Sequence, residues 1–111
     1  HPTLFVIADK VSDAALGTAG VDIDGEGTGA LGYWLGRVHW GHGIMQEAVA
    51  ALVRYAQGHP AVRRLSAVTD PDNVRSQRVL AASGLVDRGL ATRPQPSPRA
   101  SIQIREYELP I

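Results

Sequence analysis

The first 35 residues of the chain consist of short apolar runs separated by turn-forming residues, a pattern typical of β-strands. The runs cover Leu4 to Ala8, Ala15 to Ile23 and Ala30 to Leu35. We expect them to form an antiparallel meander, in which residues 24–29 are a hairpin loop exposed to solvent. That loop contains two carboxylates but lacks the ligand spacing of a calcium-binding loop, so a solvated hairpin is the favoured interpretation.

From Ile44 onward the apolar positions follow steps of three and four residues, which indicates an amphipathic helix. The helix is expected to end near Gly58-His59-Pro60 and to pack one face on the sheet. The apolar stripe consists of Ile44, Ala48, Ala51, Leu52 and Tyr55.

A fourth strand and a second helix follow, separated by a turn that contains proline. Residues 62–69 are predicted to form the strand, and Asp70-Pro71-Asp72-Asn73 ends it. The helix covers residues 74–83, begins after potential capping side chains and stops at Gly84. On this helix we expect inward positions at Val79 and Leu80 and outward positions at Arg75 and Arg78.

Two further strands close the pattern, over residues 85–90 and 101–109. Residues 93–99 between them are rich in proline, cannot sustain a sheet ladder and are expected to form an exposed loop. The order strand-strand-strand-helix-strand-helix-strand-strand predicts a single α+β domain over residues 1–111. Its sheet is expected to be mixed, largely antiparallel and about six strands wide, with two main helices.

Composition narrows the class of protein. Hydrophobic residues make up 44% of the 111 residues and charged residues 20%, as in an ordinary soluble globular domain. Eleven basic and eleven acidic residues cancel, so no overall field attracts nucleic acid or an anionic membrane. The absence of cysteine excludes disulfides, thiolate zinc sites and cysteine nucleophiles, and no apolar run approaches the length of a membrane span. We therefore expect a cytoplasmic protein that holds any anion by local geometry.

The segment Trp40-Gly41-His42-Gly43 joins the third predicted strand to the first predicted helix. Two glycines that flank one residue let the backbone turn sharply and approach a ligand closely. The free N–H groups of the helix's first turn carry the positive end of its dipole, so the loop is a candidate phosphate site. A turn of this kind can also do no more than join a strand to a helix, and the loop alone leaves that alternative open.

Three segments in this order resemble the GNAT acyltransferase superfamily, in particular the branch that includes the ribosomal-protein N-terminal acetyltransferases. They are Leu31 to Leu35, Trp40 to Ala48, and Asp72 to Leu85. The resemblance covers about residues 3 to 109. It implies acetyl-CoA as the donor of the acetyl group, a primary amine as the acceptor, and no metal. The amine would belong to a protein N-terminus or to a small molecule.

The resemblance also implies a set of CoA-binding residues. The family's pyrophosphate motif, Gln/Arg-x-x-Gly-x-Gly/Ala, maps onto Val38 to Gly43, so valine stands where the family has glutamine or arginine, and Arg37 lies one place earlier. Leu35 and its neighbours are expected to pair with the pantetheine amides as an added strand does, although Tyr33, Trp34 and Leu35 also fit plain sheet core. In and around the loop the implied residues are Leu35, Val38, His39, Trp40, Gly41, His42, Gly43 and Ile44.

Asn73 and Ser76 lie one turn apart at the start of the second predicted helix. Asn73 can serve as the helix N-cap with no ligand, whereas the resemblance implies that it hydrogen-bonds the pantetheine arm. In many family members a tyrosine further along this helix protonates the departing thiolate, but Leu80 takes that position here. Because leucine cannot donate a proton, Ser76 is the hydroxyl best placed to bond the thioester or the leaving sulfur, and it is the predicted catalytic residue.

The sequence leaves open which residue accepts the proton of the amine. Attack on a thioester needs a neutral amine, so a carboxylate or an imidazole has to take up a proton, directly or through water. A backbone N–H of the strand before the loop is expected to hold the oxyanion. The candidate bases are His39, His42, Glu47, Asp70, Glu106 and Glu108, of which Glu47 also suits the positive end of the first helix dipole.

The chain runs into a strand almost at once after His1, whereas a GNAT fold usually opens with a strand and one or two helices that line the acceptor site. We expect that a leading segment is missing, or that a partner such as a second copy of the chain completes the domain through the exposed edge of the first strand. Two alternatives to an enzyme stay open. They are a noncatalytic module that binds CoA and a protein-interaction domain whose exposed strands pair with a partner.

Overall fold

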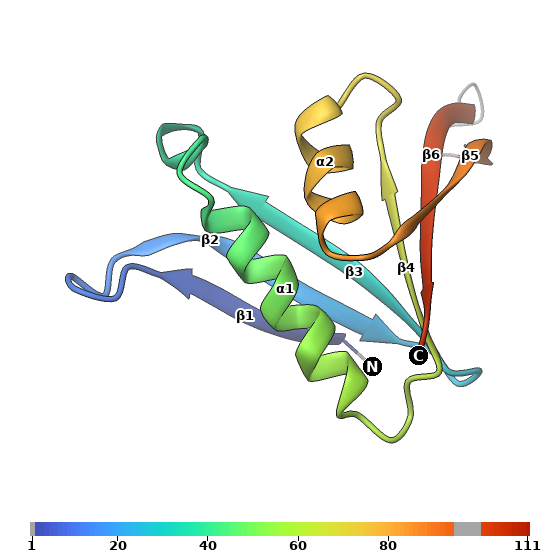
Figure 1. Cartoon of the computed structure of the whole chain (residues 1–111), viewed down its shortest axis with the longest axis horizontal. Coiled ribbons are helices and arrows are strands. Elements are labelled where there is room, and N and C mark those ends of the chain that lie inside the picture. Colours follow the sequence, from blue (N-terminus) through green and yellow to red (C-terminus); the bar gives the residue numbers. More distant parts are fainter. Residues whose placement is uncertain (1, 95–100) are drawn as a thin grey trace.

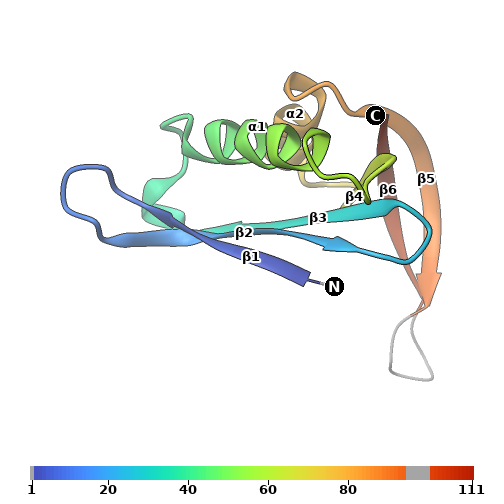
Figure 2. The ribbon, with the colours of Figure 1, turned by 90° about the horizontal axis from the view of Figure 1, so that it is seen from below.

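The computed structural model describes residues 2–94 and 101–111, which form a six-stranded mixed sheet in the order β1-β2-β3-β4-β6-β5 (Figure 1). Both α-helices lie on the same side of the sheet (Figure 2). The predicted element order and the α+β class are confirmed. Neither helix in the described ranges is long and apolar enough to cross a membrane. The elements are β1 (Pro2–Ala8), β2 (Ala15–Ile23), β3 (Thr28–Leu35), the 3₁₀ turn η1 (Arg37–His39), α1 (Ile44–Gln57), β4 (Arg64–Thr69), α2 (Val74–Ala82), β5 (Val86–Pro94) and β6 (Ser101–Pro110).

The first three strands form the predicted antiparallel meander, with β2 between β1 and β3. Asp24 holds the turn between β2 and β3, because its Oδ1 accepts hydrogen bonds from the N–H groups of Thr28 (2.9 Å) and Glu26 (2.8 Å). These bonds lower the pKa of Asp24 below its usual value. The prediction of a loop over residues 24–29 is wrong at its end, since Thr28 already belongs to β3 and Gly29 pairs with Ile23.

β3 and β4 are parallel neighbours that pair over three residues only. The pairs join Thr28–Ala30 to Arg64–Ser66. Beyond these pairs both strands continue, and Figure 1 shows them diverging. β4 pairs along its whole length with β6 on its other side. The facing edges of β3 and β4 therefore carry backbone N–H and C=O groups that have no strand partner on that side.

α1 covers the meander with a different face from the predicted one. Its buried residues belong to the main core and are Val49, Leu52, Val53 and Ala56. Within the predicted stripe only Leu52 is buried, and the other members are half-buried or exposed. The predicted stripe faces the edge strand β1, where it borders an open cavity, whereas the buried face packs toward the central strands. The helix itself and its end before Gly58 agree with the prediction.

α2 has the predicted ends. Asn73 is its N-cap, and the side-chain oxygen accepts a hydrogen bond from the Ser76 N–H (3.1 Å). Gly84 follows the helix with a left-handed φ of 95°, a conformation that glycine adopts without strain. Burial confirms the inward positions at Val79 and Leu80 and the outward positions at Arg75 and Arg78.

β5 and β6 form an antiparallel pair at the other end of the sheet. β5 is longer than predicted, because Arg93 and Pro94 pair with Ile102 and Ser101. The predicted exposed loop from residue 93 is therefore wrong for these two residues. Proline is tolerated there because β5 is an edge strand, where a missing N–H breaks no central ladder. Residues 95–99 of that predicted loop lie outside the described residues.

Gly29→Ala tests the packing at the point where β3 and β4 separate. A Cβ at Gly29 would lie 2.9 Å from Val21 Cγ2 and 3.2 Å from Leu65 Cδ2, both in the core. We expect a loss of about 1–3 kcal/mol in the free energy of unfolding by urea, the usual cost of overpacking. Gly32→Ala is the matched control in the same strand, because no atom lies within 4 Å of a Cβ there. Equal stability of the two variants would contradict this account of the junction.

Candidate functional site

A cleft of about 1080 Å³ opens between the diverging parts of β3 and β4. The loop before α1, the start of α1, one side of α2 and Ile104 of β6 form the rest of its wall, and we call it the β3–β4 cleft. Val38 and His42 do not line it, and the Val38 side chain is 83% exposed. The other predicted site residues come together in its wall and are Leu35, His39, Trp40, Gly41, Gly43, Ile44, Asn73 and Ser76.

The loop before α1 carries a row of free backbone N–H groups. Gly41 and Gly43 have left-handed φ angles of 83° and 74°. No atom lies within 4 Å of a Cβ at either position, so the backbone conformation and not crowding favours glycine here. Within the described residues the N–H groups of residues 41–46 form no hydrogen bond, and Glu47 is the first to bond, to the Gly43 carbonyl (3.1 Å). Free N–H groups at the positive end of a helix dipole suit an anionic ligand.

Two arginines add positive charge beside this loop. The Trp40 Nε1–H donates a hydrogen bond to the Leu35 carbonyl (2.9 Å), which holds the indole at the end of β3. The guanidinium carbons of Arg75 and Arg37 lie 4.7 and 5.5 Å from the centre of the indole ring, within cation–π range. Neither arginine has a carboxylate partner among the residues that the structure describes. Two like charges therefore lie near the Trp40 ring, beside the cleft.

Ser76 meets Tyr33 across the cleft. The Ser76 hydroxyl on α2 and the Tyr33 hydroxyl on β3 are hydrogen-bonded to each other. Burial raises the pKa of Tyr33, and the bond to Ser76 acts in the opposite direction. Sequence reasoning missed this contact because it treated Tyr33, Trp34 and Leu35 as one unit. Strand alternation is the signal that separates them, since Trp34 is 64% exposed on the other face and does not belong to the core.

Thr69, at the end of β4, is a second wall residue that sequence reasoning missed. It lines the cleft, and its Oγ1 is buried without a hydrogen-bond partner in the described part of the chain. A buried hydroxyl without a partner costs about 1–3 kcal/mol, so this atom favours a ligand with a polar group. Leu80, by contrast, is fully buried in the core and reaches no part of the described cleft wall.

The structure brings two of the candidate bases, His39 and Asp70, to the β3–β4 cleft. Asp70 directly follows β4 and is exposed. Glu108 pairs instead with Arg88 (3.4 Å). Across residues 2–94 and 101–111, no three histidine, aspartate or glutamate side chains gather as metal ligands would. The candidates that do not line the described cleft wall are His42, Glu47, Glu106 and Glu108.

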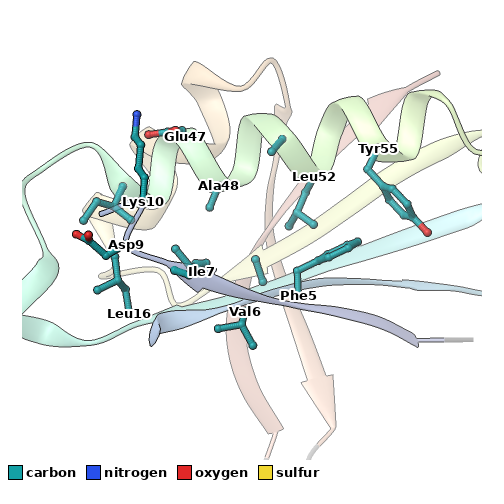
Figure 3. A pocket seen from close by; sticks show the side chains of 14 residues that line it. Phe5, Val6, Ile7, Asp9, Lys10, Leu16, Glu47, Ala48, Leu52 and Tyr55 are labelled. Atoms are coloured by element: carbon teal, nitrogen blue, oxygen red, sulfur yellow. The ribbon is translucent and has the colours of Figure 1, made fainter. Parts of the chain in front are cut away.

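A second cavity, of about 520 Å³, lies between β1 and α1 (Figure 3). Phe5 and Tyr55 meet edge to face at one end, with ring centroids 5.3 Å apart. Asp9, Lys10 and Glu47 lie near one another at the other end, and apolar side chains line the cavity between the two ends (Figure 3). Because most of this lining is apolar, the β3–β4 cleft is the better candidate for an anionic ligand.

Comparison with known proteins confirms the family resemblance that the glycine loop and the second helix carry. The chain belongs to the family described as acetyltransferase (GNAT) domain, whose model matches residues 1–86. It is similar to p20 of Bacillus licheniformis, an uncharacterized N-acetyltransferase, with 38% identity over 88 residues, 78% of this chain and 49% of p20. The chain thus spans about half the length of this curated relative.

Solved structures share the fold. The ribosomal-protein-S5-alanine acetyltransferase from Vibrio fischeri superposes with a TM-score of 0.85 and 28% identity, over 98% of this chain and 61% of that protein. The microcin C7 self-immunity acetyltransferase MccE, solved in complex with acetyl-CoA and AMP, gives a TM-score of 0.83 and 21% identity, over 99% of this chain and 61% of that protein. These similarities confirm the predicted fold class.

Proposed function

We propose that this chain is an N-acetyltransferase that binds acetyl-CoA in the β3–β4 cleft and transfers the acetyl group to a primary amine. The observation that supports this most is the cleft itself, which unites the free N–H groups of the glycine loop with Asn73 and the Ser76 hydroxyl. The family and the acetyl-CoA complex of MccE also support acetyl-CoA as the donor. We place the protein in the cytoplasm, a reducing compartment that suits a chain without cysteine.

The phosphates of acetyl-CoA bind at the loop. The pyrophosphate lies against the loop from Val38 to Ile44, where the N–H groups of residues 41–44 hold it, since these lack partners in the described residues. Arg37 and Arg75 supply cationic side chains over Trp40. These two arginines offset the valine that stands at position 38 in place of the family's glutamine or arginine.

The pantetheine arm lies along the free edge of β3. Its amides pair with backbone groups near Leu35, as an added strand does, and the Leu35 carbonyl keeps one lone pair beside the bond from Trp40. Asn73 caps α2 through its side-chain oxygen, so its amide nitrogen stays available as a donor. On the opposite wall, Thr69 Oγ1 gains the polar partner that the described residues do not supply.

The reaction is a direct transfer. The neutral amine nitrogen attacks the thioester carbonyl carbon and forms the C–N bond, and a backbone N–H of β3 holds the oxyanion. The C–S bond then breaks, and its electron pair leaves on sulfur. Ser76 donates a hydrogen bond to this sulfur, which strengthens as negative charge develops. The amine loses a proton to Asp70 or to water, and the thiolate takes up a proton.

The acceptor amine belongs to a protein N-terminus or to a small molecule. The Vibrio fischeri protein, at 28% identity, is named for an alanine of a ribosomal protein, which favours a protein N-terminus. A noncatalytic CoA-binding module is the second candidate function, because Leu80 is buried where many family members carry a tyrosine. Amine-dependent CoA release by the full-length protein separates the enzyme from the module. Calorimetry with acetyl-CoA separates both from a protein-interaction domain.

Gly43→Val should weaken the binding of acetyl-CoA. Gly43 has a φ of 74°, and valine cannot adopt this conformation without strain. We expect a loss of about tenfold in affinity by calorimetry, given a left-handed penalty of about 1–2 kcal/mol. Gly43→Asn is the matched control and should lose less, because asparagine tolerates the left-handed region. If folded valine variants at Gly41 and Gly43 both bind as the wild type does, the loop is not part of the site.

Ser76→Ala should lower turnover more than it lowers acetyl-CoA affinity. Its hydroxyl stabilises the developing thiolate, so the loss in kcat should be on the order of tenfold to a thousandfold. The substitution preserves the helix cap, which uses the backbone N–H of residue 76. Ser83→Ala is the control, because Ser83 does not line the described cleft wall and its hydroxyl donates to the Val79 carbonyl (2.9 Å). Wild-type turnover of Ser76→Ala would show that another group or water stabilises the sulfur.

A further inference from the structure

The Ser76 hydroxyl has a different partner from the other serine at the helix end. Ser83 donates its hydrogen to the carbonyl of Val79, four residues earlier (2.9 Å). Ser76 forms no such bond within the described residues, and its hydroxyl meets the half-buried Tyr33 of β3 instead. The contact spans the β3–β4 cleft from one wall to the other. A serine that is not bonded to its own helix backbone keeps its hydrogen for another acceptor.

The chemistry of the two hydroxyls favours the Tyr33 phenol as the donor. Each can donate one hydrogen and accept two. A phenol, with a pKa of about 10, is far more acidic than an aliphatic hydroxyl and is the better donor. Burial raises the pKa of Tyr33, which keeps the phenol protonated. Either hydroxyl can donate in this contact, and with the more acidic phenol as the donor to Ser76 Oγ, the hydrogen of Ser76 stays free for an acceptor in the cleft.

We propose that Tyr33 is a positioning residue that holds the Ser76 hydroxyl toward the sulfur of the donor thioester, an inference that rests on the proposed function. When the C–S bond breaks, its electron pair goes to sulfur, and the bonds from Tyr33 to Ser76 and from Ser76 to sulfur both strengthen. Each oxygen keeps its own hydrogen, and the thiolate later takes its proton from water. Many family members carry a tyrosine on this helix where α2 has Leu80. In this site the phenol comes instead from Tyr33 on the facing strand β3.

A double-mutant cycle on turnover tests this role. CoA release from acetyl-CoA is measured in the full-length protein for Tyr33→Phe, Ser76→Ala and the double variant, with a peptide that begins with alanine as the acceptor. Tyr33→Phe should lower kcat about tenfold and leave the KM for acetyl-CoA within about twofold. In the Ser76→Ala background, Tyr33→Phe should not lower kcat further, because the hydroxyl that Tyr33 positions is absent. Tyr55→Phe, which removes a phenol hydroxyl beside the second cavity, should turn over as the wild type does.

The outcomes separate this inference from the proposed function. Two results overturn the positioning role alone. One is wild-type turnover of Tyr33→Phe, and the other is a double variant whose fold loss in kcat equals the product of the two single losses. A wild-type full-length protein that releases no CoA in response to the amine overturns the proposed function. A merely structural role for Tyr33 would lower the unfolding midpoint without the split between kcat and KM, so midpoints are measured for every variant.

Discussion

The architecture of the site depends on the separation of β3 from β4 after three residue pairs. Gly29 lies at this junction, where a Cβ would collide with core side chains, and the strands diverge beyond it. Each strand keeps its outer neighbour, β2 for β3 and β6 for β4, so the opening leaves the rest of the sheet intact. The inner edges offer backbone N–H and C=O groups to a ligand with amides, as an unpaired sheet edge does to an added strand.

The charge at the cleft follows from the same topology. β3 and β4 are parallel, and each leads into a helix, so α1 and α2 both start at the same edge of the sheet. Ligands of sheets with parallel strands bind at such carboxyl ends, where helix N-termini meet. The free N–H groups of the loop and the arginines over Trp40 lie at this edge. A chain with no net charge thus acquires a local positive region through geometry.

Sequence patterns predicted what depends on local chemistry, namely the element order, the glycine loop and the cap at Asn73. They failed where the structure depends on which distant residue or strand lies opposite. The bond between Tyr33 and Ser76 joins residues 43 positions apart, and no local period encodes it. The face of α1 was misassigned because apolar spacing does not tell a central strand from the edge strand β1. Pro94 extends β5 because an edge strand tolerates proline, and edge position is a property of the sheet as a whole.

The β3–β4 cleft, and not the cavity between β1 and α1, is the proposed site for acetyl-CoA. Titration of the ¹⁵N-labelled chain with acetyl-CoA, followed by amide chemical shifts, tests it most directly. We expect the largest shifts at the amides of residues 41–46, whose N–H groups have no partner in the described residues, near Leu35 and at the start of α2. Shifts confined to residues around Phe5 and Tyr55, or no saturable shifts at all, would contradict it.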